Sequence, residues 1–254
     1  MTTGIIMKSL SFLFIFFIHL NIFGQSEFPK LTCEEFDYST TSNTRMHVNF
    51  ISLERYLEYD KDTIKTEIAH LNEDPELNKI FQKKYPDRIT KHCINSKFHE
   101  QDSIRNISFC DEKMQIKLIA KKSNFYIFKI DAFEIDNYLL FNINNELVFT
   151  MNNYPKILEN GKIVIDSGYE YGGNNAINYY VFGEEKVKYF EFRVPAYYRM
   201  KKIKILKSFN SDPKIIGAFF RYGYKGVHNS KVSGKEYIYD EEQFCRKFVM
   251  LSHK

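Results

Sequence analysis

The sequence holds few side chains whose types and spacing match a known catalytic arrangement. Ser211 and Lys214 have the S-x-x-K spacing, in which a lysine activates a serine, but Pro213 lies between them and no partner motif follows. Adjacent glutamates such as Glu241 and Glu242 would point to opposite faces of a strand. Two carboxylates distant in the sequence could still form a hydrolase site, because no local pattern reveals such a pair. We therefore expect a binding protein rather than an enzyme, without a cofactor, and keep a hydrolase lacking a recognisable motif as an alternative.

Four cysteines are the residues best suited to covalent or metal chemistry. They are Cys33, Cys93, Cys110 and Cys245, and an even number in an oxidising compartment favours two disulfides. Of the three connectivities, we favour Cys93 with Cys110, which closes a short loop, and Cys33 with Cys245, which ties the two ends together. The alternative is a zinc site that includes the two nearby histidines, but adjacent His-Cys ligands do not match the usual spacing. The sequence therefore predicts two disulfides and no metal.

Charge is distributed unevenly along a chain whose formal net charge is +4. Residues 193–235 hold eleven basic residues and one acidic residue, whereas residues 25–76 hold twelve acidic and five basic residues. Such asymmetry can mark a surface that binds a polyanion. Two alternatives stay open: the basic stretch neutralises the acidic segment within the fold, or its lysines are simply solvated.

Tyrosines are interleaved with these basic residues and offer flat partners for sugar rings or guanidinium groups. On a strand, Lys202 and Lys204 would share one face, as a one-sided basic surface requires. The loops 167–175 and 223–235 add further tyrosines, although their glycines and asparagines are also what turns require. The candidate ligand-binding residues are Tyr169, Tyr171, Tyr197, Tyr198, Arg199, Lys201, Lys202, Lys204, Tyr222, Tyr224, Lys225 and His228.

Helical patterns occupy the first part of the chain. Apolar residues repeat at helical spacing over 53–57, 64–71 and 77–81. Before the third pattern, Asp74 is the expected N-cap and Pro75 the expected first helical residue. Because these apolar stripes are narrow, we expect the helices to pack against a larger element.

That larger element is predicted from about Met114 onward, where the apolar period changes from 3.6 to 2. Asn160-Gly161 is the strongest hairpin signal, and successive strands joined by short turns imply an antiparallel meander. A weak internal repeat aligns 138–142 with 179–183, and its period of about 40 residues resembles the blade of a β-propeller over two units. The predicted fold is α+β and mainly β: short N-terminal helices on an open or bent antiparallel meander with hairpins that resemble the blades of a partial propeller.

The N-terminus has the pattern of a secretory signal peptide. Lys8 precedes an apolar run over 10–18, and Gly24 is a small residue followed by polar ones. We predict cleavage near Gly24 and export to the periplasm, the cell surface or the medium; the alternative is a retained membrane anchor. The predicted division is 1–24 signal peptide, 25–113 helical region with a disulfide loop, and 114–254 strand-rich region, which forms one compact domain with the helices.

Together these features predict an exported, non-enzymatic binding protein. Its Tyr/Lys-rich surface would contact an anionic envelope component, such as a lipid, or a glycan. The alternative is a protein-binding module, such as an inhibitor, an immunity factor or an assembly accessory, because aromatic strands also suit protein interfaces. An exposed strand edge able to pair with a partner would favour that alternative.

Overall fold

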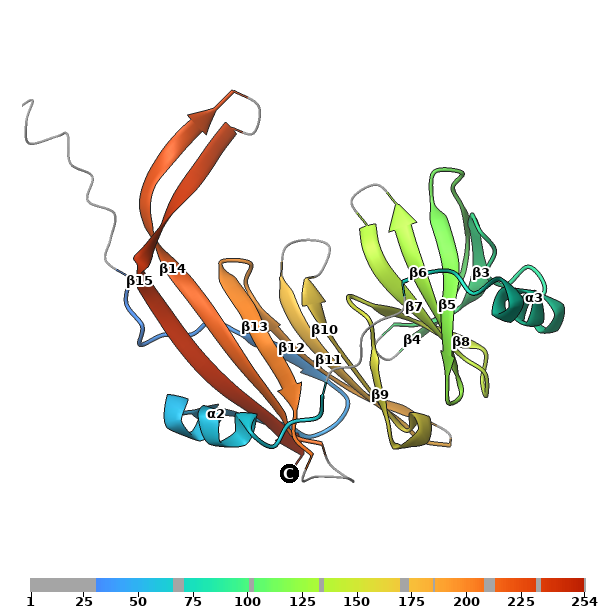
Figure 1. Ribbon diagram of the computed structural model, residues 1–254, viewed down its shortest axis with the longest axis horizontal. Helices are drawn as coiled ribbons and strands as arrows, with labels where there is room; N and C mark the ends of the chain where they lie inside the picture. The colour runs from blue at the N-terminus through green and yellow to red at the C-terminus, as the bar shows by residue number, and fades with distance from the viewer. Residues whose placement is uncertain are drawn as a thin grey trace, which may run out of the picture. The chain divides into compact units, whose positions relative to one another are not determined.

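The computed structural model describes residues 31–65, 71–100, 103–132, 135–169, 174–184, 186–207, 213–231 and 234–253 (Figure 1). These residues lie mainly in β-strands, which confirms the mainly-β prediction. The predicted signal peptide lies outside the described residues. No helix within the described ranges is long and apolar enough to cross a membrane.

Two α-helices, one short 3₁₀ helix and fifteen strands make up the described part of the chain. The helices are α2 (Leu53–Asp60), α3 (Pro75–Lys84) and η1 (Glu159–Gly161). The strands are β1 (Ser39–Ser42), β2 (Met46–Ile51), β3 (Cys93–Glu100), β4 (Ser103–Cys110), β5 (Gln115–Lys122), β6 (Phe125–Ala132), β7 (Ile135–Asn142), β8 (Leu147–Met151), β9 (Lys156–Leu158), β10 (Ile163–Tyr169), β11 (Asn175–Phe182), β12 (Val187–Val194), β13 (Tyr198–Ile205), β14 (Ile215–Ser230) and β15 (Gly234–His253).

The strands form three open sheets rather than one meander. Their orders are β1-β12-β11-β10-β9, β13-β14-β15-β2 and β4-β3-β8-β7-β6-β5. Strands close in sequence pair antiparallel, as β9 with β10 and β11 with β12, whereas β3 pairs with β8 in parallel. The resemblance of the repeat to propeller blades stays a prediction, since its two copies begin in β7 and β11, which belong to different sheets.

Each face of the five-stranded sheet has apolar side chains that pack against a second sheet. Ile163 and Ile165 of β10 pack in a core shared with the four-stranded sheet. Val164, which lies between them, packs in a core shared with the six-stranded sheet. Because successive side chains of a strand point to opposite faces, one strand contributes to both cores.

The helices cover the remaining sheet faces. Tyr56 of α2 is buried with Phe248 of the four-stranded sheet, and their ring centroids are 4.7 Å apart. Phe81 of α3 is fully buried against the aromatic rings of the six-stranded sheet, with its centroid 5.0 Å from that of Phe128. Each narrow apolar stripe thus supplies one large aromatic side chain to a core that the sheet completes.

Two of the three helical patterns correspond to helices, and the signals at the helix start are confirmed. Asp74 is the N-cap of α3 and its side chain accepts a hydrogen bond from the backbone N–H of Leu77 (3.0 Å), while Pro75 is in the first turn. The pattern over 64–71 falls largely on residues 66–70, which are outside the described residues. Strands β1 to β4, which the apolar pattern did not indicate, lie before residue 114.

The chain divides into two compact units, and the hairpin Tyr222–Phe244 belongs to the smaller one. Over these residues β14 and β15 pair with each other, and no other described strand extends along them. The ring of Tyr224 lies 4.9 Å from that of Tyr237 and 5.6 Å from that of Tyr239, measured between centroids. The hairpin is therefore a two-stranded ribbon that carries its own aromatic cluster.

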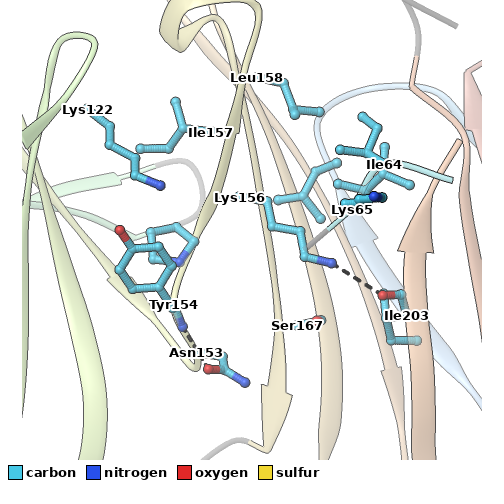
Figure 2. Close-up of a pocket in the computed structure, with 13 residues that line it drawn as sticks. Ile64, Lys65, Lys122, Asn153, Tyr154, Lys156, Ile157, Leu158, Ser167 and Ile203 are labelled. Atoms are coloured by element: carbon cyan, nitrogen blue, oxygen red, sulfur yellow. Dashed lines mark hydrogen bonds between the residues drawn. The ribbon is translucent and has the colours of Figure 1, made fainter. Parts of the chain in front are cut away.

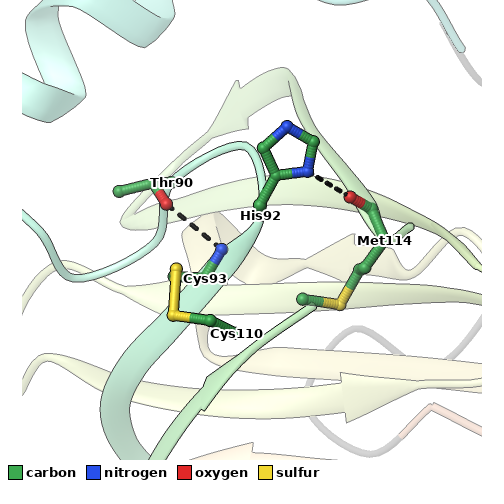
Figure 3. Close-up of a disulfide and its surroundings, with 5 residues drawn as sticks. All are labelled: Thr90, His92, Cys93, Cys110 and Met114. Atoms are coloured by element: carbon green, nitrogen blue, oxygen red, sulfur yellow. Dashed lines mark hydrogen bonds between the residues drawn. A yellow bond between two sulfur atoms is a disulfide. The ribbon is translucent and has the colours of Figure 1, made fainter. Parts of the chain in front are cut away.

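Both predicted disulfides are confirmed. Cys33 and Cys245 join segments 212 residues apart, with 5.3 Å between their Cα atoms. Cys93 and Cys110 lie directly opposite each other on β3 and β4, with 4.1 Å between their Cα atoms (Figure 3). Nδ1 of His92 beside this disulfide is 2.7 Å from the carbonyl oxygen of Met114, so Nδ1 carries the proton that it donates. The two sulfurs of each pair are bonded to each other, and such disulfides indicate an oxidising environment.

Candidate functional site

The clearest candidate site is a cavity of about 350 Å³ in the larger unit (Figure 2). We call it the lysine cavity, because three of its lining residues are Lys65, Lys122 and Lys156. Its volume is in the range of small-molecule sites. Its other lining residues are Ile64, Asn153, Tyr154, Pro155, Ile157, Leu158, Ile165, Ser167, Ile203 and Ile205.

One wall of the lysine cavity is a chain segment held against β13. The backbone N–H of Ile64 donates to the carbonyl oxygen of Ile205 (2.8 Å), and Thr63 forms an isolated antiparallel bridge with Leu206. These contacts place Ile64 and the neighbouring Lys65 at the cavity. The wall is therefore fixed by backbone hydrogen bonds, although the segment lies outside the three sheets.

The opposite wall depends on Asp166, a fully buried carboxylate of β10. Its two oxygens accept hydrogen bonds from the backbone N–H groups of Asn152 (2.8 Å) and Asn153 (2.9 Å), and one also accepts from Nδ2 of Asn178 (3.1 Å). Burial raises the pKa of this carboxyl to about 6, and the hydrogen bonds oppose that increase. The carboxylate thereby fixes the segment that carries Tyr154 into the cavity.

The interior of the lysine cavity is largely apolar. Ile157 and Leu158 of β9 line it together with Ile165, and the isoleucines of β13 complete the surface. In Figure 2, the Ile157 and Leu158 side chains lie above Lys156, and the ring of Tyr154 lies below Lys122. Apolar side chains of this kind favour a ligand that brings its own apolar surface.

The electrostatics of the cavity come from its lysines. Lys156 is half-buried and its Nζ donates to the carbonyl oxygen of Ile203 (3.3 Å). Burial lowers its pKa, and the nearby charge of Lys204 lowers it further. Nζ of Lys122 lies 5.0 Å from the centroid of the Tyr154 ring. Three lysines and no acidic residue are among the lining residues that the structure describes, so this described lining has a positive formal charge.

The structure separates the predicted ligand-binding residues of β13 into different environments. Arg199, Lys201 and Lys202 are exposed, whereas Tyr198 is 2% exposed and belongs to the core between the four- and five-stranded sheets. The hydroxyl of Tyr197 donates to Asp37. Burial, as the larger cause, and this hydrogen bond raise the pKa of Tyr197 to about 12. These residues therefore lie on one strand and the turn before it, but do not form one surface.

Lys204 shows that part of the basic stretch is neutralised within the fold. Its Nζ lies 2.6 Å from Oδ1 of Asp60, which belongs to the acidic segment 25–76. This is one contact of the kind that internal neutralisation requires. The exposed Arg199, Lys201 and Lys202 show that neutralisation does not bury the whole stretch.

The other predicted residues are distributed over the hairpin and one loop. Tyr222 and Tyr224 are half-buried, and Lys225 and His228 are exposed, all in the smaller unit. Tyr169 ends β10 and is 60% exposed. Tyr171, and likewise Ser211 of the S-x-x-K match, lie outside the described residues.

Sequence reasoning missed all three lysines of the cavity. Lys122 ends β5, Lys156 begins β9, and Lys65 follows α2, so they come from three segments with no common spacing. The local signal closest to them is the Asn160-Gly161 hairpin, which correctly joins β9 to β10 but does not indicate a cavity. Within the described residues, no group of three or more His, Cys, Asp or Glu side chains is arranged to hold a metal ion.

Comparisons of the chain with protein-family models, with curated proteins and with solved structures find no match.

Proposed function

We propose that this protein is an exported, non-enzymatic binding protein whose lysine cavity holds the acyl part and the single anionic head group of an envelope amphiphile. The observation that carries the proposal is the combination of an apolar interior with three lysines and no described acidic residue in the lining. A purely apolar ligand would leave the lysines unused, and a small hydrophilic anion would leave the isoleucines unused. An amphiphile uses both.

The state of Lys156 supports an anionic head group in particular. A half-buried ammonium whose pKa is lowered by burial and by a second lysine is held at an energetic cost. A carboxylate or phosphate next to its Nζ would offset that cost through a charge-assisted hydrogen bond. Binding of an anionic ligand is then expected to raise the pKa of Lys156 again, because the ligand stabilises the charged form of this lysine.

Export is supported by the two disulfides, since disulfides persist in oxidising compartments outside the cytosol. An envelope lipid or a lipid-derived acid is the anionic amphiphile that such a compartment offers. The exposed lysines of β13 would serve the same protein by attracting it to an anionic surface before the ligand enters the cavity.

The proposal is tested by comparing two ligands that share a ten-carbon chain and differ in head group, the anionic decanoate and the neutral decanol, by isothermal titration calorimetry on the mature chain. We expect decanoate to bind at least tenfold more tightly, because only its head group can form an ion pair with a lysine. Vesicles of phosphatidylglycerol and of phosphatidylcholine test the corresponding phosphate head group in a membrane. Equal affinity for decanoate and decanol would refute the role of the lysines.

Lys156→Met is the matched variant, and Lys129→Met is its control. Lys129 is also half-buried with a pKa lowered by burial, but it is paired with Asp136 and does not line the cavity. We expect Lys156→Met to weaken decanoate binding about tenfold and to leave decanol binding unchanged. Lys129→Met should change neither affinity.

A second candidate function, binding to another protein, is favoured by the hairpin. Its aromatic residues Tyr237, Tyr239 and Phe244 are 40–52% exposed, and each strand has an outer edge that no other described strand covers. Exposed aromatic rings and unpaired strand edges are the features that protein partners use. A photo-crosslinking residue at Tyr237 should then give one discrete protein adduct in the producing cell, whereas the same group at the exposed Lys97 of β3 should give none.

A further inference from the structure

We propose a second binding site for an uncharged saccharide, in a cleft between the six-stranded and five-stranded sheets. The cleft has a volume of about 570 Å³ and is lined from β3 and β4 on one side and from β11 and β12 on the other. It is distinct from the lysine cavity, with which it shares no lining residue. We call it the polar cleft.

The charged side chains of the polar cleft neutralise each other. Nε of Arg105 lies 3.1 Å from Oε2 of Glu100, and Nη2 of Arg193 lies 2.9 Å from Oε1 of Glu191. Two arginines and two glutamates therefore leave the described lining without a net charge from these groups. Such a lining has no preference for an ion, but it presents many donors and acceptors to a neutral ligand.

Part of this polar surface is built into the fold rather than solvated. Asn178 and Glu191 are only 7% and 8% exposed, on neighbouring strands of the five-stranded sheet. They are directly opposite in register, so the amide and the carboxylate are neighbouring polar groups of the cleft lining. Both have partners in the fold, since the Asn178 amide donates to Asp166 and Glu191 pairs with Arg193, so their burial is compensated and their positions at the cleft are fixed.

Asp166 holds the side chain of Asn178 and the backbone of Asn152, two residues of the cleft lining, in place. Asp166 accepts a hydrogen bond from Nδ2 of Asn178, and this bond fixes the orientation of the Asn178 amide group, including its oxygen. It also accepts from the backbone N–H of Asn152, whose side chain lines the cleft. A fixed amide recognises a hydroxyl with less loss of side-chain entropy than a mobile one, because it is already oriented.

Aromatic side chains complete the chemistry that a sugar requires. Tyr180 and Tyr189 line the cleft next to these polar groups. The Tyr180 ring is half-buried and packs edge-on against Phe149 of the facing sheet, with 5.8 Å between centroids. A saccharide presents hydroxyls at its edge and C–H groups on its faces, so a lining of amides, ion pairs and tyrosines matches both.

The test is a titration of the full mature chain with neutral saccharides, followed by NMR or calorimetry. The probes are cellobiose, maltose, lactose and N,N′-diacetylchitobiose, with polygalacturonate and an uncharged tetrapeptide as comparisons. We expect one or more of the four disaccharides to bind, and the peptide and the polyanion to bind more weakly. Failure of all four to bind, or tighter binding of the peptide or the polyanion, would overturn the proposal.

Asn152→Ala is the decisive variant, because it removes a side chain of the cleft and keeps the backbone N–H that Asp166 requires. Its matched control is Asn153→Ala, which changes the next residue, has the same backbone bond to Asp166, and lines the lysine cavity instead. We expect Asn152→Ala and the exposed Arg105→Ala each to weaken saccharide binding about tenfold, and Asn153→Ala to leave it unchanged. Equal effects of Asn152→Ala and Asn153→Ala would show that the saccharide does not occupy the polar cleft. Loss of saccharide binding in Lys156→Met would show the same.

Discussion

The lysine cavity and the polar cleft are organised by the same carboxylate but use charge in opposite ways. Asp166 binds the backbone N–H of Asn152, which lines the cleft, and that of Asn153, which lines the cavity. In the cavity, three lysines face apolar side chains without a described acidic residue in the lining, whereas in the cleft each arginine has its own glutamate. If the two proposals hold, the pairing of charges, rather than their number, distinguishes a site for an anion from a site for a neutral polar ligand.

This difference also explains why charge counted along the sequence is a poor guide to the sites. The most basic stretch supplies no lysine to the lining of the cavity: its Lys204 is paired with Asp60, and Arg199, Lys201 and Lys202 of β13 are exposed. Lys122 and Lys156 come instead from a part of the chain in which acidic and basic residues are nearly balanced. The position of a lysine at a cavity therefore depends on the folded segments around it and not on the charge of its neighbours in the sequence.

The largest effect is expected for Asp166→Ala, which should weaken ligand binding at both the lysine cavity and the polar cleft. The variant leaves two backbone N–H groups and the Asn178 amide without their acceptor, and each such loss costs about 1–3 kcal/mol. Removal of a buried charge offsets part of that loss, so we expect the free energy of unfolding to fall by about 4 kcal/mol. Urea unfolding followed by circular dichroism measures it.

The control for Asp166→Ala is Glu112→Ala, which removes an exposed carboxylate in the turn before β5 and should change stability by less than about 0.5 kcal/mol. Decanoate and disaccharide titrations of the Asp166→Ala variant should both show weaker binding. A variant that loses only one of the two ligands would contradict a shared anchor.

A smaller effect is the pH dependence that Asp166 gives to stability. Its pKa is raised from 3.8 to about 6 in the folded protein, so the folded state holds the proton more tightly than the unfolded state. The resulting stabilisation is complete below pH 3.8 and is lost as the pH rises through 6. A shift of this size corresponds to about 3 kcal/mol.

Asp166→Asn isolates this contribution, because it removes the titrating group and leaves the rest of the chain unchanged. We expect the stability of the wild type relative to Asp166→Asn to decrease by about 2.5 kcal/mol between pH 4 and pH 7, measured by urea unfolding at each pH. A constant difference between the two proteins over that range would mean that folding does not raise the pKa of this carboxyl.

Local features of the fold could be predicted from the sequence, and features that depend on distant contacts could not. Asp74 and Pro75 indicate the start of α3 in the sequence, because a helix start depends on residues that are neighbours in the chain. Strand β4 has no such signal: seven of its eight residues are exposed, so its pattern carries no apolar alternation. The lysine cavity could not be predicted from the sequence either, since Lys65, Lys122 and Lys156 come from three separate segments that are brought to one cavity only by folding. Disulfide pairing could be predicted because loop length alone favours Cys93 with Cys110.

The response of ligand binding to salt is a weaker effect, and it distinguishes the lysine cavity from the polar cleft in the wild-type protein. Salt screens the attraction between the cavity lysines and an anionic head group, because the Debye length falls from about 10 Å at 0.1 M to about 3 Å at 1 M. The measured quantity is the ratio of the decanoate affinity to the decanol affinity, because this ratio removes the effect of salt on apolar burial. We expect the ratio to fall about threefold between 0.05 M and 0.5 M NaCl. The half-buried position of Lys156 limits the loss, since partly buried pairs are screened less.

Disaccharide affinity should stay constant in the same titrations, because the arginines and glutamates of the polar cleft are already paired. A saccharide affinity as sensitive to salt as that of decanoate would mean that the two sites do not differ in the way their charges are compensated.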